Sequence, residues 1–308
     1  MKLAAALLGI VMFGYQTGEP LVRSRLEWFD RSGNPVATLG ELADYGNVEL
    51  SPDGTQVAVT LVASGERTHD IWFYNTSSGR STQFTKTPAD ENWLIWSPDG
   101  RQVVFNRFSR EASELYSAPS DGTGPEQLLL SGEDGVWPVS WSPDGQFILF
   151  VKNSARTGND IWVLPLSGDR QAYPIFQTQY AENWAAFSPN GKWIAFSSTF
   201  SGMPVVYISP FPTDGNVLRV SDYSGTQARW RRDGKEIFYL DPEKNLMAVP
   251  VNDTGADVEM GGARLLFQTN YPYPPYHAFD AGTDGERFLV NTLILAPGKP
   301  TNIARLNQ

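Results

Sequence analysis

Short apolar runs recur along the chain in pairs, and each pair flanks a tight polar turn. Residues 93–96 precede one such turn and residues 103–105 follow it. The turn has the form Ser-Pro-Asp-Gly, in which proline presets φ, aspartate tolerates the bend and glycine accepts a positive φ. Two apolar runs joined in this way predict a β-hairpin. The turn recurs in six places, and the third residues are Asp53, Asp99, Asp144 and Asn190 in the four close copies and Asp233 and Asp284 in two weaker ones, Arg-Arg-Asp-Gly and Gly-Thr-Asp-Gly.

The spacing of these turns predicts a repeat architecture. Successive turns lie 43 to 51 residues apart, and a period of about 40–50 residues with four strands per unit is typical of a β-propeller. We name the strand before each turn A and the strand after it B. A third strand, C, has the repeated form Asp70-Ile71-Trp72, and strand D has the weakest pattern. Four C strands run into a proline that is expected to mark a strand end or bulge, at Pro119, Pro165, Pro210 and Pro250.

The two ends of the chain are expected to complete one blade together. Two strand-like segments, 26–29 and 36–39, precede the first full hairpin, and a further segment, 302–306, follows the last one. The last unit supplies strands A and B, so one or both N-terminal segments should close the ring and remove its exposed edges. The prediction is an all-β fold: a six-bladed β-propeller of four-stranded antiparallel blades over residues 22–308.

The N-terminus carries an apolar run from residue 3 to residue 13. This run is too short to span a membrane and has the size of the hydrophobic region of a secretory signal. Residues 1–21 are therefore expected to be a signal peptide or the remnant of a membrane anchor. The chain is expected to be periplasmic or otherwise exported, with membrane contact only through this segment if it is not cleaved.

Composition excludes several classes of site. The chain has no cysteine, so disulfides and thiolate metal sites are absent, and its two histidines, His69 and His277, cannot form a three-histidine metal site. A net charge of −10 argues against nucleic acid as a partner. The sequence has neither a Gly-x-Ser-x-Gly elbow nor the motifs of a protein kinase. We therefore expect no cofactor and no enzymatic activity.

The Trp-Ser-Pro-Asp-Gly turns, the Asp-Ile-Trp strand and the period together resemble the TolB-like six-bladed propeller family over residues 22–308. Within that family, residues 206–212, 228–239 and 246–251 are similar to propellers appended to bacterial serine/threonine kinases. The resemblance implies a sensor or interaction module, related to receptor kinases or envelope proteins. It is expected to act as a monomer that binds a protein or a small molecule.

The starts of the A strands are the candidate binding site, because in a propeller they converge at the end of the channel opposite the Ser-Pro-Asp-Gly turns. They carry carboxylates, amides and aromatic rings that suit a peptide, a sugar or a cation. The candidate residues are Tyr45, Glu91, Asn92, Trp93, Trp137, Glu182, Asn183, Trp184, Gln227, Tyr276 and His277.

Two alternatives to this binding site remain open. In the structural one, the tryptophans pack between blades and the Glu-Asn pairs hydrogen-bond neighbouring turns. In the enzymatic one, Glu91 and Glu182 serve a carboxylate-metal-dependent lyase or lactonase.

Overall fold

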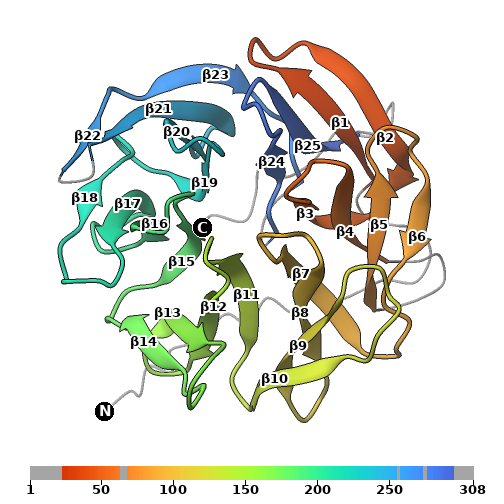
Figure 1. Ribbon diagram of the computed structural model, residues 1–308. Helices are drawn as coiled ribbons and strands as arrows, with labels where there is room; N and C mark the ends of the chain where they lie inside the picture. The colour runs from red at the N-terminus through yellow and green to blue at the C-terminus, as the bar shows by residue number, and fades with distance from the viewer. Residues whose placement is uncertain (1–22, 63–67, 255–256, 273–275, 295–308) are drawn as a thin grey trace, which may run out of the picture.

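The computed structural model describes residues 23–62, 68–254, 257–272 and 276–294. These residues form six antiparallel blades around a central axis (Figure 1). The predicted six-bladed propeller is thus confirmed. Nowhere in this part of the chain is there a helix long and apolar enough to cross a membrane. The predicted signal segment, 1–21, lies outside the described residues.

In the first three blades the strands follow one another in chain order A, B, C and D. Blade 1 contains β3 (Tyr45–Leu50), β4 (Gln56–Val62), β5 (His69–Asn75) and β6 (Ser81–Gln83). Blade 2 contains β7 (Asp90–Trp96), β8 (Gln102–Phe108), β9 (Ser113–Pro119) and β10 (Gln127–Gly132). Blade 3 contains β11 (Val136–Trp141), β12 (Phe147–Ser154), β13 (Gly158–Pro165) and β14 (Tyr173–Phe176).

Blade 4 keeps this order with a very short strand D, whereas blades 5 and 6 depart from it. Blade 4 contains β15 (Glu182–Phe187), β16 (Trp193–Ser198), β17 (Val205–Pro210) and the short β18 (Leu218–Arg219). Blade 5 contains β19 (Thr226–Trp230), β20 (Glu236–Leu240), β21 (Asn245–Asp253), β22 (Val258–Met260) and β23 (Arg264–Gln268). Blade 6 contains β24 (Phe279–Ala281), β25 (Arg287–Leu293), β1 (Ser24–Asp30) and β2 (Pro35–Ala43).

Both N-terminal strands close the ring, as the sequence suggested. Strand β1 pairs with β25 over its whole length, with Trp28 opposite Leu289, and β2 forms the outer edge of the same sheet. The first strands of the chain are therefore strands C and D of blade 6. The further predicted segment, 302–306, lies outside the described residues.

Blade 5 has a fifth strand that the repeat pattern did not predict. Residues 245–248 of β21 pair with β23, which serves as strand D of this blade. Residues 251–253 of the same strand pair instead with β22, the additional strand. Pro250 stands where the partner changes, which suits a residue without an N–H to donate. The other three prolines are the last residues of β9, β13 and β17, where a strand end was expected.

The repeated turns are hairpin turns on one face of the ring, which we call the bottom face. In the first copy the Gly54 N–H donates to the Ser51 carbonyl at 2.8 Å, and the Ser51 hydroxyl donates to Asp53 at 2.7 Å. The glycines of all six copies have φ between 69° and 75°, so each turn needs the left-handed conformation that glycine accepts readily. The top face carries the B-to-C and D-to-A connections.

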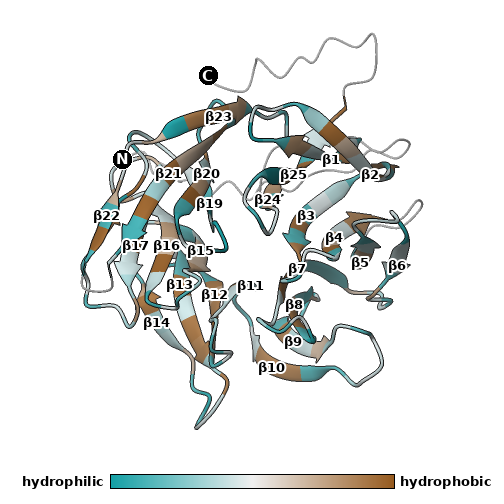
Figure 2. Cartoon of the chain, turned by 45° about the horizontal axis from the view of Figure 1, so that its top comes forward, coloured by the Kyte–Doolittle hydropathy of each residue, from teal (hydrophilic) through white to brown (hydrophobic). Residues whose placement is uncertain are grey.

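Buried side chains of the described residues form six clusters, and each cluster lies between two adjacent blades. On β8, for example, Val103 and Phe105 face blade 1 while Val104 faces blade 3. Each sheet is thus buried on both faces, which is why strand B reads as a continuous apolar run. Figure 2 shows hydrophobic segments along strands such as β16 and β21.

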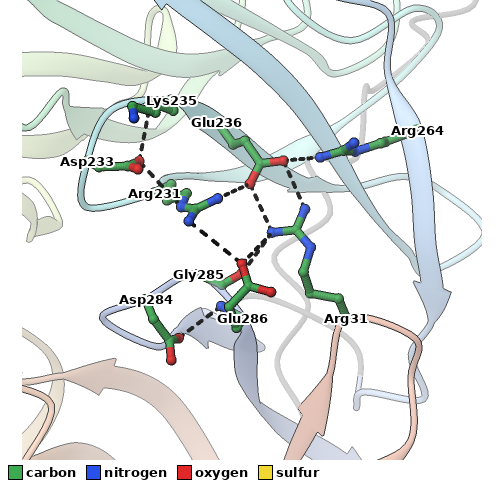
Figure 3. A network of polar contacts seen from close by, with 9 residues as sticks. All are labelled: Arg31, Arg231, Asp233, Lys235, Glu236, Arg264, Asp284, Gly285 and Glu286. Carbon is green, nitrogen blue, oxygen red and sulfur yellow. Dashed lines mark hydrogen bonds and ion pairs between the residues drawn. The ribbon is translucent and has the colours of Figure 1, made fainter.

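A buried glutamate joins blades 5 and 6 at the bottom face (Figure 3). Glu236, whose side chain is 5% exposed, accepts two hydrogen bonds from Arg31 at 2.8 and 2.9 Å and one from Arg231 at 3.0 Å. Arg264 also donates to it. Burial alone would raise the pKa of Glu236, but these arginines lower it to about 2. Because Arg31 follows β1, the cluster fixes the N-terminal strands against blade 5.

Replacing Glu236 by Gln is expected to destabilise the fold by about 3 kcal/mol near neutral pH, because three arginines lose their buried counter-charge. The wild-type contribution is present above the unfolded carboxyl's pKa of 4.5 and is lost as the pH falls toward about 2. Urea unfolding of both proteins over this range measures the difference. Glu286→Gln is the control, since Glu286 lies 3.9 Å from Arg31 and its side chain is 56% exposed. Equal losses in the two variants would contradict the assignment.

Candidate functional site

Irregular pairing at the top of strand A turns side chains toward the axis. The A–B register shifts between Glu91 and Leu94 in blade 2, and between Asn183 and Ala186 in blade 4. At the second of these bulges Trp184 has a φ of 60°, a conformation that bulky residues rarely adopt. Bulges re-aim side chains. Trp93 and Trp184, from blades that are not adjacent, consequently meet with ring centroids 5.5 Å apart.

These side chains border a cavity of about 410 Å³ on the top face, a size typical of small-molecule sites. Asn159 donates to Asn183 at 2.9 Å, and the Tyr276 hydroxyl donates to Asn92 at 3.1 Å, so the amides have defined orientations. None of the lining side chains is charged. The lining consists of Asn92, Trp93, Phe108, Trp137, Asn159, Asn183, Trp184 and Tyr276. We call this cavity the top pocket.

Aromatic rings form the floor of the top pocket. Trp93 stacks with Trp137 at 6.2 Å and meets His277 edge to face at 5.3 Å. His277 also packs on Trp184 at 4.9 Å, and beneath these rings its Nδ1 accepts a hydrogen bond from Arg229. A second cavity of about 340 Å³, bordered by Arg229 and the prolines of the turns, opens on the bottom face. The rings and Arg229 fill the axis between the two cavities.

A buried charge cluster lies below this floor. Arg229 donates to Glu49, and its Nε lies 4.0 Å from Asp280. Burial raises the pKa of Glu49 and of Asp280, and the Arg229 guanidinium opposes both shifts. Burial and Arg229 together lower the pKa of His277, so this imidazole is neutral. The cluster thus links Arg229 of blade 5 to Glu49 of blade 1 and to Asp280 of blade 6.

Six of the predicted site residues come together in the top pocket: Asn92, Trp93, Trp137, Asn183, Trp184 and Tyr276. The pocket has two further members, Phe108 and Asn159, which the sequence-based list did not include. Phe108 ends β8 and Asn159 lies at the start of β13, so both adjoin B-to-C connections, which lie on the top face. What the sequence lacks is a signal for which loop residue turns inward.

Glu91 and Glu182 do not line the pocket. Both are buried: Glu91 accepts from Thr87 and Arg107, and Glu182 accepts from Thr178. Burial raises the pKa of each carboxyl, and these hydrogen bonds oppose the shift. Neither carboxylate therefore offers a ligand to the top pocket, as the metal-dependent alternative would require there. Within the described residues, no group of three or more His, Cys, Asp or Glu is placed to hold a metal ion.

The remaining predicted site residues have structural contacts instead. The buried Tyr45 donates its hydroxyl to the Glu41 carbonyl at 2.9 Å. Gln227, with a φ of 57°, bridges to blade 6 by donating to the Tyr276 carbonyl at 3.1 Å and accepting the Ala278 N–H at 2.8 Å. The His277 ring belongs to the pocket floor. These three residues fit the structural alternative, because they connect neighbouring blades.

Comparison with known proteins places the chain among propellers. No protein-family model matches it. It is 28% identical over 192 residues to an uncharacterized peptidase of Bacillus subtilis, YuxL; the match covers 50% of this chain and 29% of that protein. It is 29% identical over 214 residues to an uncharacterized protein of Agrobacterium fabrum, covering 64% of this chain and 69% of the other. The chain thus spans less than a third of the Bacillus peptidase.

Solved structures share the fold at low sequence identity. A protein assigned to TolB from Agrobacterium tumefaciens superposes with a TM-score of 0.66 at 17% identity, over 90% of this chain and all of the other. An oligogalacturonate lyase in complex with manganese superposes with a TM-score of 0.55 at 12% identity, over 86% of this chain and 77% of the other. The TolB-like propeller architecture is therefore confirmed. The similarity to kinase-appended propellers stays a prediction.

These matches contradict the sequence-based prediction that the chain is not an enzyme. A third curated relative, at 22% identity, is the dipeptidyl-peptidase 5 of Porphyromonas gingivalis, covered over 35% of its length. Proteins with peptidase names thus match this chain over part of their length, and a lyase shares the fold over most of its chain. The absence of a nucleophile elbow and of a histidine cluster therefore does not separate this sequence from enzymes.

Replacing Arg229 by Met is expected to destabilise the protein by about 3–5 kcal/mol at about pH 8, because Glu49 and Asp280 become buried charges without a cation. Without Arg229 their pKa values rise further, so the variant should regain stability as the pH falls to about 5. Urea unfolding at both pH values measures this. Arg101→Met, at an exposed position beside the turn of blade 2 on the bottom face, is the control, with an expected loss below about 1 kcal/mol. A pH-independent loss at Arg229 would contradict the electrostatic explanation.

Proposed function

We propose that the top pocket binds an uncharged segment of a peptide, and that the chain works in peptide recognition and processing. The observation that carries this proposal is the lining itself: three tryptophans and three asparagines with no charged side chain. Asparagine amides offer both donors and acceptors, which match the N–H and C=O groups of a peptide backbone. Tryptophan faces supply contact area for apolar side chains or proline rings.

The uncharged lining argues against a metal ion as the ligand, because the two nearby glutamates are engaged in other hydrogen bonds and do not line the pocket. It leaves a peptide and a neutral sugar as candidates. The peptidase names of two curated relatives support the peptide. A propeller in such a protein would supply the surface on which the substrate is recognised. Export through the N-terminal segment, and a sensor role at the cell envelope, stay predictions.

Trp137→Ala tests the pocket. Trp137 is half-buried and stacks on Trp93, so its removal is expected to weaken peptide binding at least about tenfold while the fold survives. Short linear peptides are selected from a random displayed library against the wild-type protein, and their affinities are measured by tryptophan fluorescence. Mass spectrometry of the same peptides reports whether they are hydrolysed.

Trp193→Ala is the matched control, because Trp193 is a half-buried tryptophan at the bottom face that donates to Asp253. It should leave peptide binding unchanged. A panel of neutral oligosaccharides is measured in parallel. Equal peptide affinity in the Trp137 variant and the wild type, or binding of oligosaccharides alone, would refute the proposal.

A further inference from the structure

Exposed aromatic side chains gather on the top face of blade 4. Phe200, in the connection after β16, is 63% exposed, and its ring meets Tyr180 edge to face with centroids 5.3 Å apart. Tyr223, in the connection after β18, is 69% exposed. Of the large hydrophobic side chains in the described residues, Phe200 and Tyr223 are the two most exposed.

Hydrogen bonds fix the loops that carry these rings. On one side of the Phe200 loop, the Thr199 N–H donates to the Ala181 carbonyl at 3.1 Å, and the Ala181 N–H returns a bond to the Thr199 hydroxyl at 3.0 Å. On the other side, the Ser224 hydroxyl donates to the Pro204 carbonyl at 2.7 Å. The Phe200 loop is thus tied to the Tyr180 loop and to the Tyr223 loop, so the three loops are held together on this face.

The buried Glu182 organises the first two rings. Its carboxylate accepts hydrogen bonds from the hydroxyls of Thr178 at 2.5 Å and Ser198 at 3.4 Å. The Thr178 hydroxyl oxygen accepts the Tyr180 N–H at 3.0 Å, and the Ser198 hydroxyl oxygen accepts the Phe200 N–H at 3.1 Å. Glu182 and Ser198 are paired across β15 and β16, and each ring lies two residues beyond this pair. One carboxylate therefore positions both aromatic residues.

Blade 2 has the same framework without the rings. There Glu91 pairs with Arg107 across β7 and β8 and accepts a hydrogen bond from Thr87, the fourth residue before it. The positions equivalent to Tyr180 and Phe200 are occupied by Ala89 and Ser109. Because the connection from Thr87 to Glu91 forms with Ala89 in place of the tyrosine, the fold does not require an aromatic residue at the Tyr180 position.

We propose that Tyr180, Phe200 and Tyr223 form a second subsite, which binds an apolar or aromatic side chain of the same peptide that occupies the top pocket. This inference rests on the proposed function. The two sites lie within reach of one peptide, since Tyr180 is only three residues from the pocket residue Asn183, at most about 10 Å along the chain. Exposed aromatic residues on a rigid scaffold supply much of the affinity at protein interfaces. The net charge of −10 favours a neutral or basic peptide.

The test uses peptides selected by the wild-type protein, together with versions shortened at either end. Phe200→Ser and Tyr223→Ser are each expected to weaken binding of the full peptides about tenfold, and to leave unchanged the binding of shortened peptides that have lost their aromatic or apolar anchor. Both positions are exposed, so the variants should keep the wild-type melting temperature. Leu265→Ser, at a 57% exposed apolar position on β23, is the matched control and should bind like the wild type.

The outcomes separate this subsite from the top pocket. If Trp137→Ala weakens binding but the Phe200 and Tyr223 variants do not, the subsite is refuted and the proposed function stands. If neither kind of variant changes peptide binding, or if the library yields no peptide, both proposals fail. Sedimentation checks a third outcome: conversion of a dimer into a monomer by Phe200→Ser would make the rings a self-association surface and would overturn the subsite.

Discussion

Packing between neighbouring blades is the interaction on which the rest of the structure depends. Each blade buries both faces of its sheet, so no blade has a complete core of its own. The last interfaces form only when β1 pairs with β25, the two strands lying at opposite ends of the described chain. The top pocket depends on the same closure, because Trp93 of blade 2 contacts Trp184 of blade 4 and His277 of blade 6. A change that opened the ring would therefore dismantle the site as well.

Two buried ion pairs lie where the ring closes. Arg229 reaches Glu49, and Arg31 reaches Glu236, across sequence separations of 180 and 205 residues. Both pairs connect blades 5, 6 and 1, the part of the ring where the two ends of the chain meet. A buried ion pair adds little net stability over apolar packing, but a broken pair is costly. Such pairs consequently penalise a misaligned closure, in which one partner would be left without the other.

The sequence predicted the elements whose signals are local. The turn chemistry around Asp99 and the apolar runs beside it located strands A and B, and the count of turns gave the number of blades. It did not predict the fifth strand of blade 5 or the short β18, because three- and two-residue strands carry no periodic signal. The sequence also could not distinguish Asn92, which lines the pocket, from its neighbour Glu91, which does not. The bulge between Glu91 and Leu94 interrupts the alternation of side chains between the two faces of the strand, so the alternation does not predict which residue points into the pocket. The long-range partners of Arg229 were equally beyond it, since they come from other blades.

Departures from the repeat are the most informative part of the chain. In the fifth turn Arg231-Arg232 replaces Ser-Pro; Arg231 bonds Glu236, and Arg232 donates to the Ser51 carbonyl at 2.8 Å. On blade 4 Tyr180 and Phe200 occupy positions where blade 2 has alanine and serine, although both blades keep the same Thr-Glu framework. Blade 2 shows that the connection before strand A forms without an aromatic residue, so the ring of Tyr180 is not needed to build it. Phe200 packs on that ring and is itself largely exposed, and in our proposal a ligand that extends out of the top pocket covers both.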